Sequence, residues 1–146
     1  MATEPEKVLM ERRFHGTREE MRQMREALRT VLAANGADTE QQQRVVLAVC
    51  EACMNIVQHG YDGRPGPIGL TLRRRDDHLE VELVDEAPTL SPLDLIPRQR
   101  EALRPGGLGL HLIRSIMERV ELEAAGAEGG NRLRMVTQLE HGAKGK

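Results

Sequence analysis

The run Glu51-Ala52-Cys53-Met54-Asn55-Ile56-Val57-Gln58-His59 decides the fold, together with the later run Gly106-Gly107-Leu108-Gly109-Leu110. The first run sets polar residues one turn apart inside an apolar helix pattern. At 100° per residue, its Glu, Asn and His fall within an arc of about 80°, bordering the apolar stripe. The second run places a glycine loop at the start of a helix. Together the two runs indicate a small domain that binds a nucleotide.

The polar stripe offers two useful groups. Glu51 supplies a carboxylate that can orient or deprotonate a nucleophile. Asn55 supplies a neutral carbonyl oxygen, which suits a hard cation such as Mg²⁺. Taken by themselves, Glu51 and Asn55 also fit solvated positions on a helix. His59 also fits a residue at the helix C-terminus.

Glycines before a helix let backbone N–H groups approach a phosphate, and the helix N-terminus favours negative charge. The run from Gly106 to Leu110 is neither a Walker loop nor a dinucleotide fingerprint. Alone, it also fits a flexible turn. Arg104, just before it, suits a phosphate contact or a solvated loop charge. Asp85 ends a strand, where its carboxylate can accept a hydrogen bond from the amine of adenine.

Composition bounds the function classes. The chain has 146 residues, which favours a single domain over 1–146 with a core from about 8 to 140. The formal net charge of −2 gives no basic footprint, so we expect no direct nucleic acid binding. Phe14 and Tyr61 are the aromatic residues, which argues against a base-stacking platform. The sequence shows no signal peptide or membrane-spanning run, so we expect a cytoplasmic protein without membrane contact.

Cys50 and Cys53 form a C-x-x-C spacing, which is found in redox pairs and in half of a zinc site. Both fall within the helix pattern, where cysteine commonly serves as a small buried apolar residue. We therefore expect two buried thiols.

Periodicity and turn signals predict the order β-α-α-β-β-loop-α-β-β. Val8, Met10 and Arg12 are placed on one face of the first strand. The expected elements are a strand over 8–14, helices over 17–34 and 38–59, a hairpin over 68–83, a long connection over 85–105, a helix reaching Val120, and a hairpin of 121–125 with 132–139. This order predicts an α+β sandwich with a mixed, mostly antiparallel sheet and helices on one face.

Taken jointly, three segments resemble the Bergerat-fold (GHKL) ATPases, and more closely their bacterial anti-sigma-factor serine/threonine kinase branch. Residues 47–61 look like that branch's N box. Val84-Asp85-Glu86-Ala87-Pro88 looks like its first glycine box, and residues 106–113 look like the second. The resemblance covers roughly residues 17–139. It implies a two-layer α/β sandwich with an ATP lid over about 86–105.

The resemblance also implies roles for single residues. Glu51 matches the catalytic base and Asn55 the Mg²⁺ ligand. Asp85 matches the adenine-reading carboxylate, and Arg104 a basic lid residue near the γ-phosphate. The nucleotide-binding positions carried over are Asn55, Asp85, Ala87, Arg104, Gly106, Gly107, Leu108, Gly109 and Leu110.

The chain departs from the family pattern at two places. Ala87 stands where the first box usually has glycine, which puts the closeness of adenine packing in question. The last strand often carries a Thr near adenine, whereas this chain reads Asn131-Arg132-Leu133-Arg134. Thr137 takes that place only if the register differs.

The function implied is a serine/threonine protein kinase and anti-sigma factor. It would use Mg·ATP to phosphorylate a serine of a STAS-type anti-anti-sigma partner and would bind a sigma factor, in a partner-switching pathway. The charged first helix is a docking and homodimerisation face or simply a solvated one. Two alternatives stay open: an ATP-gated binding module with little turnover, and an interaction domain without nucleotide.

Overall fold

The computed structural model describes residues 6–88, 109–126 and 129–140. Within them one five-stranded sheet has the order β1-β2-β3-β5-β4, and every pairing is antiparallel. The strands are β1 (Lys7–Phe14), β2 (Ile68–Arg75), β3 (His78–Asp85), β4 (Arg119–Ala124) and β5 (Asn131–Gln138). The structure confirms the predicted order of strands and helices and the two hairpins.

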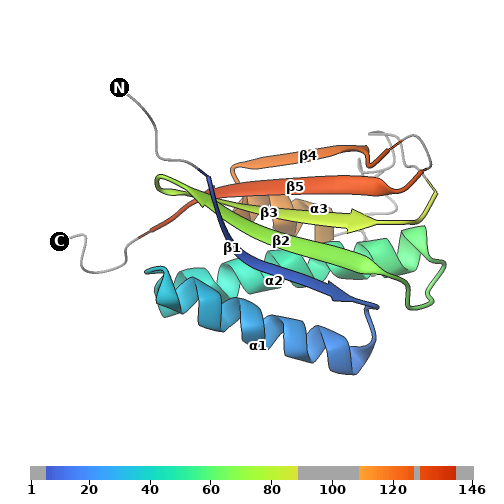
Figure 1. Cartoon of the computed structure of the whole chain (residues 1–146), viewed down its shortest axis with the longest axis horizontal. Helices are drawn as coiled ribbons and strands as arrows, with labels where there is room; N and C mark the ends of the chain where they lie inside the picture. The colour runs from blue at the N-terminus through green and yellow to red at the C-terminus, as the bar shows by residue number, and fades with distance from the viewer. Residues whose placement is uncertain (1–5, 89–108, 127–128, 141–146) are drawn as a thin grey trace.

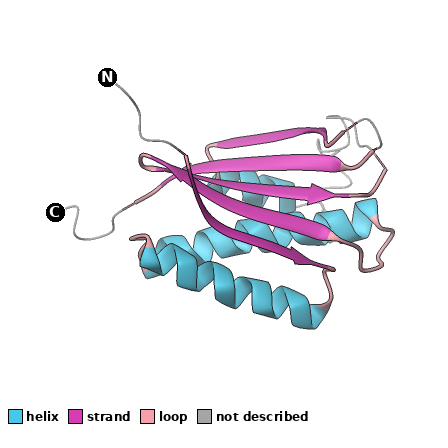
Figure 2. Ribbon diagram, in the orientation of Figure 1, coloured by secondary structure: helices cyan, strands magenta, loops and turns pink. Residues whose placement is uncertain are grey.

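The described residues form three α-helices, which lie on one side of this sheet (Figures 1 and 2). They are α1 (Arg18–Ala34), α2 (Thr39–Asn55) and α3 (Gly109–Ile116), and a π-helical turn, η1 (Ile56–Gly60), continues α2. Two side-chain caps fix where α1 and α2 begin. The Thr17 hydroxyl accepts from the Glu20 N–H at 3.1 Å, and the Asp38 carboxylate accepts from the Gln41 N–H at 2.8 Å.

The core lies between the helices and the facing side of the sheet. Every second residue of the inner strands is buried there, as period-two alternation requires. Large side chains with almost no exposed surface fill this layer: Met24, Leu28, Leu32, Ile68, Leu70, Leu72, Leu79, Leu83, Ile113 and Met135. The core thus covers one face of the sheet and leaves the other to polar groups.

The opposite face of the sheet carries charged side chains in alternating signs. Glu82 of β3 sits at its centre and is 7% exposed. Arg73 on β2 reaches it at 2.6 Å, and Arg132 on β5 lies 2.5 Å away from its other oxygen, an ion pair without the alignment of a hydrogen bond. Cross-strand pairs of this kind take the place of hydrophobic packing on this face.

Two expectations about element ends are wrong. Val8 pairs with Arg73 and is 51% exposed, because the β1–β2 register shifts between Val8 and Met10 and turns Val8 away from the core. Val120 belongs to β4 rather than to the third helix. The Glu118 N–H donates to the Val136 carbonyl at 2.8 Å, so sheet pairing ends the helix there.

Within the described ranges, the structure holds no helix that is both long and apolar enough to span a bilayer.

Candidate nucleotide site

The predicted polar stripe lies on α2, whose other side is packed into the core. Glu51 and Asn55 are half-buried, whereas their neighbours Ala52 and Cys53 are fully buried. Residues four apart on an α-helix share a face, so the structure brings this carboxylate and this amide together, as predicted. Among the described residues, the Glu51 carboxylate has no hydrogen bond or ion pair. A carboxylate without such partners suits contact with a polar group of a ligand.

The side-chain oxygen of Asn55 lacks a hydrogen-bond partner in the part of the chain that the structure describes. Asn55 Oδ1 is buried, and no donor of the described chain lies within hydrogen-bonding reach. A buried polar atom without a partner costs about 1–3 kcal/mol, so such an atom calls for a ligand. The described ranges contain no cluster of three or more His, Cys, Asp or Glu residues able to hold a metal ion. A single amide oxygen still fits Mg²⁺, because this ion usually keeps several waters and takes its remaining ligands from phosphates.

The helix changes type directly after Asn55. The sequence predicts a helix to His59, but α geometry stops at Asn55 and η1 follows as a wider turn. The Tyr61 N–H donates to the Ile56 carbonyl at 3.0 Å, and the Gly63 N–H donates to the Val57 carbonyl at 2.8 Å. Single π turns are frequent at functional sites. Here the π turn leads the chain from Asn55 towards the end of β3.

Asp85, the last residue of β3, is 5% exposed and lies opposite Asn131 in the β3–β5 register. Its Oδ1 accepts from the Ala87 N–H at 2.9 Å and from Asn131 Nδ2 at 3.0 Å. Burial raises the pKa of this carboxyl, and the hydrogen bonds from Asn131 and Ala87 oppose that rise. The backbone of Asn131 also bonds to this carboxylate. A carboxylate has about four acceptor positions, so these bonds leave capacity for an amine of a bound base.

Ala87, the departure from the family pattern, is 2% exposed. Its N–H is bound to Asp85, and its carbonyl accepts from the Gly130 N–H at 3.0 Å. A Cβ built at Gly60 would lie 2.8 Å from the Ala87 methyl, so this methyl is directed at η1. The extra carbon is thus packed within the protein.

Several predicted site residues lie outside the described residues. They are Arg104, Gly106, Gly107 and Leu108, along with the part of the predicted lid over 89–105. Gly109 and Leu110 open α3, as the sequence predicts for the end of the glycine loop. Ile113 of α3 is buried in the core, and α3 packs against α2, the helix with Glu51 and Asn55.

The sequence does not predict the contacts of two residues at the end of β3. Asn131 occupies the place beside Asp85, whereas Thr137 pairs with Leu79 at the far end of the sheet. Knowledge of the β3–β5 register would have identified Asn131. The Tyr61 hydroxyl accepts from the Glu86 N–H at 2.8 Å, at the end of β3. No spacing in the sequence signals that contact.

The C-x-x-C pair is packed as expected. Cys53 is buried and Cys50 is partly buried, and both are free thiols. Burial raises the pKa of each thiol. Raised pKa values keep thiols protonated and poorly reactive, which argues against a redox pair.

Several known proteins are similar to this chain in sequence. The histidine kinase-like ATPase domain family matches residues 14–137. A serine-protein kinase RsbW from Bacillus pumilus is 32% identical over 112 residues, which are 69% of this chain and 69% of that protein. The corresponding kinase of Halalkalibacterium halodurans is 34% identical over 88 residues, 54% of this chain and 53% of that protein. The chain therefore spans between about half and two thirds of the length of these curated relatives.

Two solved structures share the fold. The SiaB–SiaC complex from Pseudomonas aeruginosa contains a chain with a TM-score of 0.65 and 22% identity, covering 90% of both chains. The RsbU and RsbW domains of a Mycobacterium tuberculosis protein give a TM-score of 0.63 and 21% identity, covering 93% of this chain and 33% of that one. These likenesses establish the two-layer Bergerat-type α+β architecture.

Proposed function

Since this chain belongs to the histidine kinase-like ATPase family, in the branch that holds the serine-protein kinases named RsbW, we propose that it is a cytoplasmic serine protein kinase and anti-sigma factor. Its substrates are Mg·ATP and a serine of a STAS-type anti-anti-sigma protein, and a sigma factor competes with that protein for binding. The observation that carries the proposal is the buried, unpartnered oxygen of Asn55, one turn after Glu51.

Each part of the substrate has a residue that suits it. Asp85 accepts a hydrogen bond from the exocyclic amine of adenine while Asn131 and Ala87 hold the carboxylate in place. Asn55 offers its Oδ1 to Mg²⁺, which when bound neutralises charge on the phosphates. We expect the residues from Arg104 to Leu110 to line the phosphates.

Glu51 acts on the partner. Its carboxylate orients the serine hydroxyl and accepts the proton as the serine oxygen bonds to the γ-phosphorus. The bond between that phosphorus and the β–γ bridging oxygen breaks, and ADP leaves. Phosphoryl transfer depends mainly on positioning and charge neutralisation, so this small set of groups is chemically sufficient. The phosphate adds a charge of about −2 to the partner, which favours its release.

The test combines the chain with γ-labelled ATP, Mg²⁺ and its cognate STAS-type protein. We expect transfer of label to a serine, and a loss of about 10²- to 10⁴-fold in Glu51→Gln, the usual contribution of a general base. Nucleotide affinity should stay near the wild-type value in this variant.

Glu40→Gln is the matched control. Glu40 lies in the first turn of the same helix, with its side chain 82% exposed, and is expected to transfer phosphate at the wild-type rate. Equal transfer rates in Glu51→Gln and wild type would show that the base is assigned wrongly. ATP binding without any transfer would instead support the nucleotide-gated binding module, and no binding at all would support an interaction domain without nucleotide.

A further inference from the structure

A small group of contacts ties the π turn to the end of β3. We call it the η1–β3 joint and define it as Gly60, Tyr61, Glu86 and Ala87. Gly60 closes η1, five residues after Asn55, and Ala87 follows Asp85 by two. The joint therefore lies between the proposed metal ligand and the proposed adenine reader. Ala87 is among the nucleotide-binding positions that the resemblance implies, and none of the four residues has a part in the proposed phosphoryl transfer.

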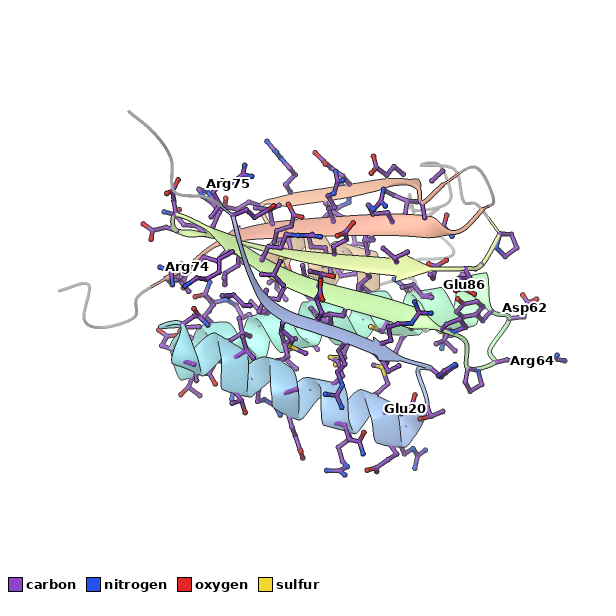
Figure 3. The ribbon with its side chains drawn as sticks, viewed as in Figure 1. Glu20, Asp62, Arg64, Arg74, Arg75 and Glu86 are labelled. Carbon is purple, nitrogen blue, oxygen red and sulfur yellow. The ribbon has the colours of Figure 1, made fainter. Side chains whose placement is uncertain are left out.

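Tyr61 supplies the polar half of the joint. Its hydroxyl donates to the Pro67 carbonyl at 2.7 Å and accepts from the Glu86 N–H at 2.8 Å. A Cβ added at Gly66 would lie 2.6–2.7 Å from three carbons of the Tyr61 ring, so the ring packs closely against the backbone of the loop that follows it. Figure 3 shows Glu86 at the same end of the molecule as Asp62 and Arg64 of that loop. One phenol thus connects the loop after η1 to the backbone directly after Asp85.

The apolar half of the joint is the contact of Ala87 with Gly60. The distance of 2.8 Å from the Ala87 methyl to a Cβ at position 60 leaves room for one methyl group only. The φ of Gly60 lies outside the left-handed region, so space rather than backbone strain selects glycine there. Ala87 in turn holds the Asp85 carboxylate through its N–H.

We propose that Tyr61 and Ala87 are positioning residues that hold Asp85 at a fixed place relative to Asn55. The inference rests on the proposed function, in which one nucleotide is bound by its base at Asp85 and through Mg²⁺ at Asn55. A ligand held at two points gains from both only when the points are fixed at the matching distance. If the contacts of the joint are lost, Asp85 still binds the base, but most of the increase in nucleotide affinity that Mg²⁺ provides is lost.

The test measures the affinity for ADP with Mg²⁺ and with EDTA, in wild type and in Tyr61→Phe. Phenylalanine keeps the ring and removes both hydrogen bonds of the hydroxyl. We expect the affinity in EDTA to change by less than about twofold and the affinity with Mg²⁺ to fall by about tenfold, the size of one lost hydrogen bond. Thr30→Val is the control, since it removes a hydroxyl that bonds the Glu26 carbonyl of α1, remote from the joint.

A second arm moves the methyl group across the joint. We expect Gly60→Ala to reduce the increase in ADP affinity that Mg²⁺ provides, because two methyl groups then compete for one space. The double variant Gly60→Ala with Ala87→Gly restores the single methyl and should recover the gain. This arm gives a result even if Tyr61→Phe fails to fold, and thermal unfolding identifies the variants that do fold.

The outcomes separate the two proposals. Wild type that does not bind ADP overturns the proposed function, and the joint with it. Suppose that wild type binds ADP more tightly with Mg²⁺ than with EDTA. If Tyr61→Phe keeps that increase in affinity, or loses affinity equally in both conditions, that result overturns the proposal for the joint and the proposed function stands. A double variant no better than Gly60→Ala does the same, and so does wild type whose binding of ADP gains nothing from Mg²⁺.

Discussion

Two buried carboxylates on one strand have partners of different charge. Glu82 and Asp85 lie three residues apart on β3, are 7% and 5% exposed, and point to opposite faces of the sheet. Glu82 faces two guanidinium groups, those of Arg73 and Arg132. Asp85 is held by the side-chain amide of Asn131 and by the backbone of Ala87 and Asn131, all of them neutral groups.

The difference separates a charge neutralised within the protein from one that we propose meets a ligand. Arg73 and Arg132 neutralise Glu82 within the protein, so burying it serves the fold. Among the described residues, no ion pair neutralises Asp85, and its burial raises its pKa. An uncompensated buried charge lowers stability, and such groups concentrate where a ligand supplies the missing contact. Substitution of Asp85 should therefore lower nucleotide affinity, whereas substitution of Glu82 should lower the free energy of unfolding.

The largest effect is expected for Asp85→Asn. The new amide keeps an oxygen for the Ala87 N–H but loses the charge that favours the adenine amine. Affinity for Mg·ADP should fall by about 10- to 100-fold, the size of a hydrogen bond to a charged group, as measured by calorimetric titration. IDP carries a carbonyl in place of the amine and should lose far less. An equal loss for both nucleotides would remove the adenine-reading role from Asp85.

A smaller effect, of another kind, is expected for Glu82→Gln. Two arginines lose their shared partner, although Arg73 keeps Glu80 at 3.1 Å and Arg132 keeps Glu123 at 3.2 Å. The free energy of unfolding in urea should fall by about 1–2 kcal/mol, below the usual cost of breaking a fully buried pair. Nucleotide affinity should be unchanged.

Glu121→Gln is the control for that loss. Its ion pair with Arg119 spans 3.8 Å between exposed side chains, so less than about 0.5 kcal/mol is expected. If Glu82→Gln were as stable as this control, Glu82 would not be a structural charge.

The smallest effect concerns pH. The folded-state pKa of Asp85 is raised above its ordinary value of 3.8, so the carboxyl favours the folded state when protonated. That contribution to stability is fully present below pH 3.8 and is lost as pH rises through the folded-state pKa.

Two measurements follow from this sign. Asp85→Asn should unfold at a slightly higher temperature than wild type at pH 7, with the advantage vanishing in acid. Affinity for Mg·ADP should fall as the solution is acidified through the raised pKa. A lower unfolding temperature for Asp85→Asn at pH 7 would show that the ionised carboxylate stabilises the fold.

Part of the candidate site was predicted from the sequence, whereas the role of Glu82 was not. Alternating apolar residues placed Asp85 at a strand end, and helical spacing placed Glu51 and Asn55 on one face of α2. The resemblance gave these residues their roles, which remain predictions. The family and the fold are confirmed by the comparisons.

The remaining features depend on tertiary contacts. The approach of Asn131 to Asp85 follows from the β3–β5 register, and no local signal in either strand sets it. The exposed face of Val8 follows from a bulge, which a period-two pattern does not reveal. The π turn after Asn55 covers only five residues, too few for periodicity to distinguish it from an α-helix.

The most direct test is an NMR titration of the labelled protein with Mg·ADP. We expect large shifts for the Asn55 side-chain amide and for the backbone amides of Asp85, Ala87 and Asn131, while Glu80 and Glu82 on the same strand shift little. Shifts centred on Glu82 and its arginines, with the Asn55 and Asp85 signals unmoved, would contradict the assignment of the nucleotide to this end of the sheet.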